Sequence, residues 1–219
     1  RLPYVENLVN LLVVEKAGPV PQDEIRRVVA PGGAVCRRDG DTWAVWRKPR
    51  PDGIDEWTHY LHDAGGNAVA HDRQVGPPRE LQWVGSPRWA RHHDRMASMN
   101  ALVSANGRLF YVIDEGPTAA IMLPSEWTLV ARDAFNGTVL WKRPLPSWHP
   151  HLWPMKSGFA QLPRRLVAVG NRVYVPLGME APLTCLDAAT GDVVRTYEGT
   201  AAAEEVLSLD GVLYVLSNP

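Results

Sequence analysis

Cysteine, long hydrophobic runs and net charge are all scarce in this sequence, and each scarcity excludes a class of protein. Only Cys36 and Cys185 occur among 219 residues, far apart in different segments, which excludes a disulfide framework and leaves the compartment open. No apolar run approaches the roughly 20 residues that a membrane-spanning helix needs, so we expect no membrane span. Lys and Arg total 23 against 24 Asp and Glu, and this balance lacks the positive excess typical of nucleic-acid-binding proteins.

Glycine and proline, in contrast, are frequent, with 18 and 19 residues. Their abundance favours many short strands and turns over long helices. The chain length suits one large domain or two small ones. We therefore expect a globular protein that consists mainly of β-structure.

A strand–turn–strand motif occurs twice. Residues 131–141 read ARDAFNGTVLW and residues 185–194 read CLDAATGDVV, so the Asp and Gly of the first copy recur in the second. Asn-Gly between two apolar runs is the strongest short-range signal for a hairpin, because both central residues of its tight turn need a positive φ. The leading Asp can accept hydrogen bonds from the amides of its own turn. A repeated β unit of this kind must stack on neighbours to bury its faces.

A second motif, a tight turn followed by an apolar strand, occurs three times, at residues 106–112, 170–175 and 210–215. The full unit reads strand, turn, strand, link, strand, D-A-x-[NT]-G turn, strand. It takes 40 residues to return from Asn171 to Gly211, close to the roughly 40–50 residues of a four-stranded propeller blade. We expect about three four-stranded antiparallel blades. The chain starts without methionine and ends inside such a unit, which predicts a fragment of a larger protein.

The pattern A-x-D-A-x-[NT]-G-x-x-x-W resembles the repeat of the PQQ-type, quinoprotein-like β-propellers. This family includes quinoprotein alcohol dehydrogenases and BamB-like outer-membrane assembly lipoproteins. Residues 131–141 match the pattern in full, whereas the second copy has Cys185 in place of the Ala and Arg195 in place of the Trp. The resemblance covers roughly residues 56–219 and implies a partial PQQ-repeat propeller. It indicates the fold rather than the activity, because catalytic and non-catalytic propellers share the repeat.

Residues 1–46 have the pattern of an α/β unit. The nearly continuous apolar run at 7–14 is typical of a strand covered on both faces. Pro21 suits the start of a helix, which the Pro-Gly-Gly sequence from Pro31 should end. Strands are then expected at residues 34–36 and 42–46.

The motifs LPYVEN at residues 2–7 and VAPGG at residues 29–33 resemble the late part of a class I S-adenosylmethionine-dependent methyltransferase. In that family a glycine-rich loop near the first strand holds the cofactor, and this sequence contains no such loop. We therefore expect a short Rossmann-like remnant at 1–46 that binds no cofactor by itself. The Pro-rich, basic residues 47–55 are typical of a linker, and residues 56–219 form the incomplete PQQ-like blades.

A dense polar cluster just before the blades is one candidate binding site. Its guanidinium, imidazole and indole groups could form a rim that binds an anion or a sugar. Propellers bind ligands at loops over the central channel. The alternative is an ion-paired edge of a blade. The cluster contains Arg88, Trp89, Arg91, His92, His93 and Arg95.

A second candidate is an insertion between repeats at residues 144–154. Trp148, His149 and His151 lie there, and aromatic rings with imidazoles can bind carbohydrate or quinone rings. Insertions in repeat proteins map to loops on one face, which is often the binding face. The alternative is packing between blades.

The segment before the blades contains His59 and His62, three residues apart, with Asp63 adjacent. Two imidazoles and a carboxylate at this spacing would suit zinc or iron. No third or fourth ligand is visible nearby, with His71 and Asp72 as the best candidates, so we expect no metal. The alternative is a hydrogen-bonded polar loop that pins this segment across the propeller. The same segment fits W-x-x-Y-x-x-D-x-x-x-[NT], which resembles the opening of PQQ-type propellers, through Trp57, Tyr60, Asp63 and Asn67.

The resemblance implies two main classes of function. We expect a binding or assembly scaffold within a larger bacterial protein, with a protein or carbohydrate ligand at the propeller loops and no nucleic acid. The alternatives are a quinoprotein dehydrogenase, in which PQQ and a divalent ion lie on the axis beside adjacent cysteines, or methyltransferase activity of the intact parent. No adjacent cysteines occur, so we expect no catalytic residue and no cofactor in this chain alone. The resemblance also suggests a periplasmic or extracytoplasmic location.

Overall fold

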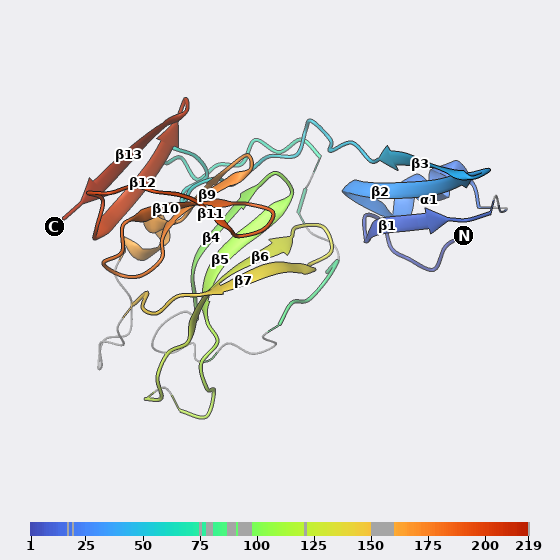
Figure 1. Ribbon diagram of the computed structural model, residues 1–219. Coiled ribbons are helices and arrows are strands. Elements are labelled where there is room, and N and C mark those ends of the chain that lie inside the picture. The colour runs from blue at the N-terminus through green and yellow to red at the C-terminus, as the bar shows by residue number, and fades with distance from the viewer. Residues whose placement is uncertain are drawn as a thin grey trace. The chain divides into compact units, whose positions relative to one another are not determined.

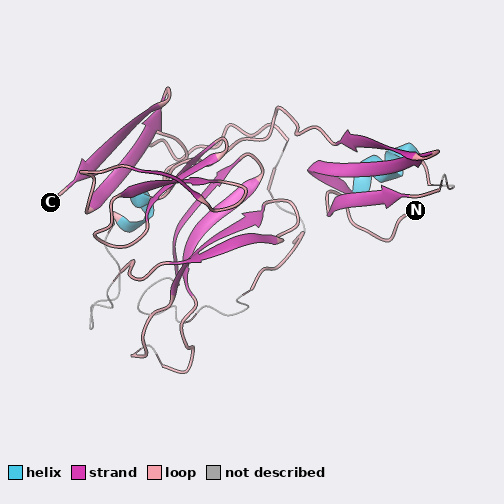
Figure 2. Ribbon diagram, viewed as in Figure 1, coloured by secondary structure: helices cyan, strands magenta, loops and turns pink. Residues whose placement is uncertain are grey.

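The computed structural model describes the chain except at residues 17, 19, 75, 78–80, 87–90, 92–97, 121, 150–159 and 219. Strands dominate the regular structure (Figure 2), which confirms the predicted mainly β class. Tertiary contacts divide the chain into two units. The first contains Arg1–Asp55, Asp72–Val84 and Ala134–Gly137, and the second contains Glu56–His71, Gly85–Asp133 and Thr138–Pro219.

The first unit contains a three-stranded sheet and one helix (Figure 1). Its elements are β1 (Val9–Val14), α1 (Gln22–Val28), β2 (Val29–Asp39) and β3 (Thr42–Arg47). β1 and β2 are parallel, and β3 pairs with β2 in the antiparallel direction. Two acidic residues in the first turn of α1 complement the positive end of the helix. The predicted order of strand, helix, strand and strand is therefore present.

The start of β2 differs from the sequence prediction. The Pro-Gly-Gly sequence was expected to end the helix, but α1 already ends at Val28 and β2 runs through these residues from Val29. Gly32 has a φ of +80°, which glycine adopts readily. The register against β1 shifts at this point. The glycines therefore form an irregularity inside a strand rather than a loop before it.

The helix α1 covers one face of this sheet. Ile25 and Val28 are buried together with Val35 of β2, and Trp46 of β3 packs against them. The opposite face has no helix over it among the described residues of this unit. It exposes Leu11, Val13, Trp43 and Val45, each over at least half of its surface.

The second unit contains three sheets of antiparallel strands (Figure 1). The first has β4 (Met99–Ala105), β5 (Arg108–Asp114), β6 (Trp127–Asp133) and β7 (Val139–Pro144). The 3-10 helix η1 (Leu162–Arg165) precedes the second, which has β8 (Val167–Val169), β9 (Arg172–Pro176), β10 (Leu183–Asp187) and β11 (Val193–Thr196). The third has β12 (Ala203–Leu209) and β13 (Val212–Ser217) among the described residues. Two complete blades and half of a third agree with the predicted partial propeller.

Glycine occupies the predicted corners. Gly137 and Gly191 have φ angles of +72° and +76°, in a region that other residues rarely adopt. In the second corner, Asp187 Oδ1 accepts hydrogen bonds from the backbone N–H of Ala189 at 2.9 Å and of Thr190 at 3.2 Å. The D-A-x-[NT]-G motif therefore encodes the turn through both its Asp and its Gly.

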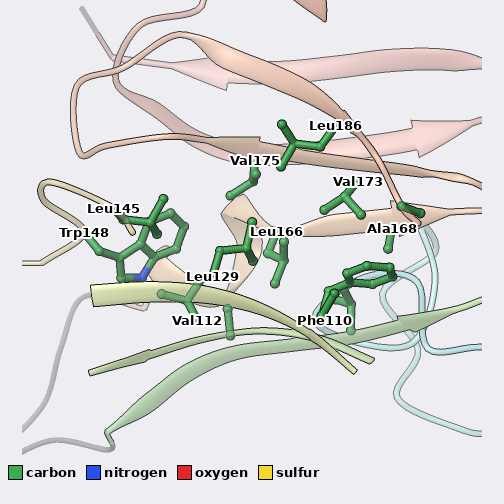
Figure 3. Close-up of a cluster of buried hydrophobic side chains, with 14 of the residues drawn as sticks. Phe110, Val112, Leu129, Leu145, Trp148, Leu166, Ala168, Val173, Val175 and Leu186 are labelled. Carbon is green, nitrogen blue, oxygen red and sulfur yellow. The ribbon is translucent and has the colours of Figure 1, made fainter. Parts of the chain in front are cut away.

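The main core lies between the first and second four-stranded sheets (Figure 3). Phe110 and Leu129 of the first sheet and Val173 and Val175 of the second are completely buried in it. Trp148, from the connection between the sheets, is also fully buried there. Each sheet thus buries a face against its neighbour, as expected of repeated units that cannot bury their faces alone.

Residues 57–59 join the first strands of all three sheets, and we call them the axial segment. The Ser104 N–H of β4 donates a hydrogen bond to the Trp57 carbonyl (2.7 Å), and the Ala168 N–H of β8 donates one to the Thr58 carbonyl (3.0 Å). The Ser208 N–H of β12 donates one to His59 Nε2 (3.0 Å). β4, β8 and β12 are the edge strands of their sheets. The three sheets therefore converge on one short segment, as blades converge on a propeller axis.

Candidate functional site

The long connections of the three sheets lie at one end of their strands. Antiparallel neighbours alternate in direction, so the tight turns after β4, β6, β8, β10 and β12 share one end. The remaining connections return at the other end, which we call the loop face. Their described parts are residues 115–120, 122–126, 145–149, 160–166, 177–182 and 197–202. The expected insertions therefore lie on one face.

A cavity of about 410 Å³ opens on the loop face between the first two sheets. Three different connections contribute to its wall, so the cavity exists only because the two sheets are packed side by side. Its chemistry is mixed, with two aromatic rings, two hydroxyls, a thioether and a carboxylate. The lining residues are Ser125, Trp127, Pro146, Ser147, His149, Met179 and Glu180.

Trp127 and His149 form the aromatic part of this cavity. Their ring centroids are 6.4 Å apart, and the Trp127 indole N–H donates a hydrogen bond of 3.2 Å to the His149 carbonyl oxygen. Ser147 Oγ accepts a hydrogen bond of 3.2 Å from the backbone N–H of Met179, which ties two of the connections together. The cavity is thus preorganised, and its rings and carboxylate suit an amphipathic or cationic side chain.

Trp148 and His149, both predicted as ligand-binding residues, lie in different surroundings. Trp148 has no exposed surface and belongs to the core between the sheets (Figure 3), which corresponds to the packing alternative. His149 is 4% exposed and lines the cavity. His151 lies outside the described residues.

Arg91 is the one member of the predicted polar rim that the structure describes. Its side chain is 1% exposed and pairs with the equally buried Asp114 at 2.6 Å. Its Nε–H also donates to the Pro117 carbonyl at 2.9 Å, and Nη2 donates to the Leu123 carbonyl. Arg91 therefore holds the 115–126 connection in place. Outside the described residues lie Arg88, Trp89, His92, His93 and Arg95.

Asp114 completes this buried ion pair. Its Oδ1 accepts hydrogen bonds of 2.9 Å from the backbone N–H of Gly116 and of Glu126. Burial raises the pKa of Asp114, but these amides and Arg91 outweigh burial and hold the pKa below its ordinary value. The carboxylate therefore stays ionised and fixes both ends of the connection.

His59 has both ring nitrogens engaged by the protein. Nε2 accepts the Ser208 amide proton, so it carries no proton of its own. Nδ1 then donates to the Thr58 hydroxyl, 2.8 Å away. Burial lowers the pKa of His59, and the nearby Asp63 opposes this effect. These two contacts fix the neutral ring between Thr58 and β12.

His62 and Asp63 form a looser pair, with His62 Nδ1 3.3 Å from Asp63 Oδ2. The His62 ring is buried between the edges of Trp57 and His71, with centroid distances of 5.3 and 5.2 Å. His59 and His62 point into different environments, since His59 binds β12 and His62 packs on aromatic rings. These contacts therefore do not bring the imidazole rings of His59 and His62 together as a pair of ligands.

A smaller hollow of about 240 Å³ lies where the axial segment meets η1 and β12. Arg164 of η1 pairs with Glu205 of β12 at 2.6 Å, and its guanidinium lies 6.0 Å from the centre of the Tyr60 ring. His59 and Asp63 also line it. Its lining therefore contains both acidic side chains and the guanidinium of Arg164, which is already paired with Glu205.

Several residues of the loop face were not predicted from the sequence. Trp127, Met179 and Glu180 line the large cavity, and Arg165 is a buried cation beside it. The signal that could have found them is the spacing of the repeats, because the extra residues between β5 and β6 mark a lengthened loop. The spacing alone does not say which of its side chains face a neighbouring sheet.

Residues 13–197 match the family model described as outer membrane protein assembly factor BamB. This match covers most of the chain and extends into the segment that resembles a methyltransferase, for which the comparisons give no support. No curated protein matches the chain significantly. Within the part of the chain that the structure describes, no helix is long and apolar enough to cross a membrane.

Proposed function

This chain belongs to the PQQ-repeat family of outer membrane protein assembly factor BamB, and from this membership we propose that it is a non-catalytic scaffold that binds a partner protein through its loop face. The family description points to a partner in outer-membrane protein assembly, and hence to an extracytoplasmic location. The observation that carries the proposal is the cavity between the first two sheets, built by three connections from different strands.

Contacts among the described residues fix parts of the loop face, as a preformed binding surface requires. The Arg91–Asp114 pair is buried and fixes residues 115–126. The Ser147–Met179 hydrogen bond joins the two connections on the other side of the cavity. A preformed surface loses little conformational entropy when a partner binds. A side chain of the partner could enter the cavity and lie against Trp127 and His149.

The quinoprotein alternative fits the described residues less well. In that class PQQ lies on the propeller axis with adjacent cysteines beside it. Here the inner strands β4, β8 and β12 are bonded to the axial segment, and the two cysteines, Cys36 and Cys185, are both free and far apart in sequence. A carbohydrate ligand remains compatible with the cavity, since Trp127 offers an aromatic ring and Ser125 and Ser147 offer hydroxyls.

Site-specific photocrosslinking tests the proposal. A photoreactive residue replaces Pro146 or Glu180, both exposed on the loop face, or Ala189 at the opposite end as the matched control. We expect one and the same envelope protein to be crosslinked from both loop-face positions and not from Ala189. Equal crosslinking from Ala189, or no common protein, contradicts the proposal.

A titration with PQQ and calcium separates the enzyme alternative. The scaffold proposal expects no saturable change in the quinone absorbance when the chain is added. A stoichiometric complex would instead favour the quinoprotein class.

A further inference from the structure

Arg165, the last residue of η1, is a cation that the fold buries without completing its hydrogen bonds. The residue is 8% exposed. Its Nη1 donates one hydrogen bond, 3.3 Å long, to the Met179 carbonyl. Its Nε is buried without a hydrogen-bond partner. A guanidinium has five N–H donors, and among the described residues Arg165 uses one of them, in the bond to Met179.

No carboxylate of the described residues forms an ion pair with Arg165. The charge of Glu204 acts on it only from beyond ion-pair distance, and burial lowers the pKa of the guanidinium from its ordinary value. The group nevertheless remains charged at neutral pH. A buried cation without a partner costs stability, because its lost hydration is not replaced.

Arg91 shows what a structural arginine looks like in the same protein. It is as deeply buried, yet it binds a carboxylate and two carbonyl oxygens. Arg164, next to Arg165, pairs with Glu205 at 2.6 Å. Of these three arginines, Arg165 alone lacks an anion. The described part of the fold therefore gives Arg165 no anion of the kind that the other two arginines have.

The position of Arg165 places it at the loop face. It lies two residues before the start of β8, and Met179, whose carbonyl accepts its hydrogen bond, lines the cavity between the sheets. A planar carboxylate matches the parallel N–H groups of a guanidinium. We propose that Arg165 anchors an anion site on the loop face that receives a carboxylate, either an acidic side chain of a protein or a small free acid.

This inference goes beyond the proposed function and does not depend on it, because small carboxylates are sufficient to test it. The probes are N-acetylglutamate N-methylamide, which carries the carboxylate of a protein side chain, and citrate, which is a free acid. Both are titrated into the full chain at constant ionic strength, with sodium chloride as the reference. Thermal unfolding and titration calorimetry report binding.

Without a probe, we expect Arg165→Met to unfold at the same temperature as the unsubstituted chain or higher, because it removes an unpaired buried charge. Arg91→Met should unfold at a clearly lower temperature, because it removes the counter-ion of the buried Asp114 carboxylate. If Arg165→Met is destabilised as much as Arg91→Met, or does not fold, Arg165 is structural and the proposal is wrong.

With a probe at about 100 times its dissociation constant, the unfolding temperature of the unsubstituted chain should rise by about 5 °C. The neighbouring control Arg164→Met should show the same rise, and Arg165→Met should show none. Arg165→Lys keeps the charge but not the planar fork and should bind about tenfold more weakly.

The two probes distinguish the source of the carboxylate. A response to the glutamate derivative supports a protein side chain, and a response to citrate alone supports a free acid. A rise of equal size in the unsubstituted chain and Arg165→Met, or no response to either probe, overturns the proposal.

Discussion

The first and second four-stranded sheets end in outer strands that differ at one equivalent position, Trp141 in β7 and Arg195 in β11. The Trp141 ring lies over Gly191, the corner of the second sheet, and its indole N–H donates a hydrogen bond of 3.1 Å to the Ala188 carbonyl. Arg195 instead lies over the ring of Tyr197, near the end of its own strand, at 5.0 Å. The Trp141 side chain of β7 therefore contacts the next sheet, whereas the Arg195 side chain of β11 contacts a residue just beyond the end of its own strand.

This difference shows what joins neighbouring sheets at their outer edges. The outer strands are short and mostly exposed, so their backbone ladders contribute little to the contact between sheets. Two side chains of β7 make the contact: the Trp141 indole packs on Gly191, which has no side chain, and Arg143 Nη2 donates a hydrogen bond of 2.6 Å to the Gly191 carbonyl. The same contact occurs in the first unit, where Trp83 packs on Gly137 and its indole N–H donates to the Ala134 carbonyl at 3.2 Å. The repeat therefore encodes both partners of this contact, a Trp on one side and a Gly corner on the other. We call this Trp–Gly contact the joint.

The largest effect is expected for Gly191→Val. A Cβ atom here would lie 2.7 Å from the Trp141 ring, and the φ of +76° is strained for a β-branched residue. The two effects together should destabilise the protein by about 4 kcal/mol. Gly137→Val, opposite Trp83, should behave in the same way. Chemical denaturation measures both.

Gly211→Val is the matched control. Gly211 has a φ of +78°, but no atom lies within 4 Å of an added Cβ. This variant should show the backbone strain alone, about 2 kcal/mol. Equal losses at Gly191 and Gly211 would mean that the Trp141 contact adds nothing.

The second effect concerns Trp141→Ala, which removes the indole from the joint. The side chain is half-buried, so the loss should be about 3 kcal/mol, at the lower end of the range for Trp truncations. Arg195→Ala, at the equivalent position of β11, should cost less than about 0.5 kcal/mol. A loss of similar size at both positions would remove the distinction between the two outer strands.

The joint also explains why the blades could be predicted from the sequence. Asp133, Gly137 and Trp141 act within a few residues of each other, so their spacing carries the turn geometry. The predicted strands and corners of residues 99–217 follow from this local information. The predicted helix end at Pro31 was wrong, because pairing with β1 overrode the local preference of the Pro-Gly-Gly sequence for a turn.

The candidate site could be predicted only in part, because its contacts join residues distant in sequence. The insertion containing His149 was identified, but its partners Trp127 and Glu180 come from the start of β6 and from the 177–182 connection. The sequence left Arg91 either in a ligand-binding rim or in an ion-paired blade edge, and only the structure identifies Asp114 as its ion-pair partner. Charge and composition indicate which residues could bind a ligand, whereas packing decides which of them are already engaged.

A smaller, pH-dependent effect is expected where the third sheet meets the axial segment. The pKa of folded His59 lies below the ordinary value of 6.5, because burial disfavours the charged ring. As the pH falls below 6.5, the unfolded chain therefore takes up a proton that the folded chain resists, and stability decreases. This contribution is fully present above the unfolded pKa and is lost as the pH falls toward the folded value.

His59→Gln tests this expectation, since its amide oxygen can still accept the Ser208 amide proton. Denaturation between about pH 8 and about pH 5 should show a shallower loss of stability than in the unsubstituted chain. The protection factor of the Ser208 amide against hydrogen exchange should fall at low pH in the unsubstituted chain only. The control is His71→Gln, an exposed histidine. An unchanged pH profile in His59→Gln would show that His59 does not titrate with folding.

The smallest effect is expected for Arg195→Trp, which restores the repeat pattern in β11. Trp141 is stabilising because Gly191 and the Ala188 carbonyl receive it, whereas no described residue offers Arg195 such a corner. An exposed indole in β11 should therefore change the unfolding free energy by no more than about 0.5 kcal/mol. Chemical denaturation of Arg195→Trp beside Arg195→Ala measures this directly. A gain of about 2 kcal/mol or more would show that a tryptophan in an outer strand is stabilising without a glycine corner opposite it. The glycine would then not be needed for the stabilising effect of the tryptophan.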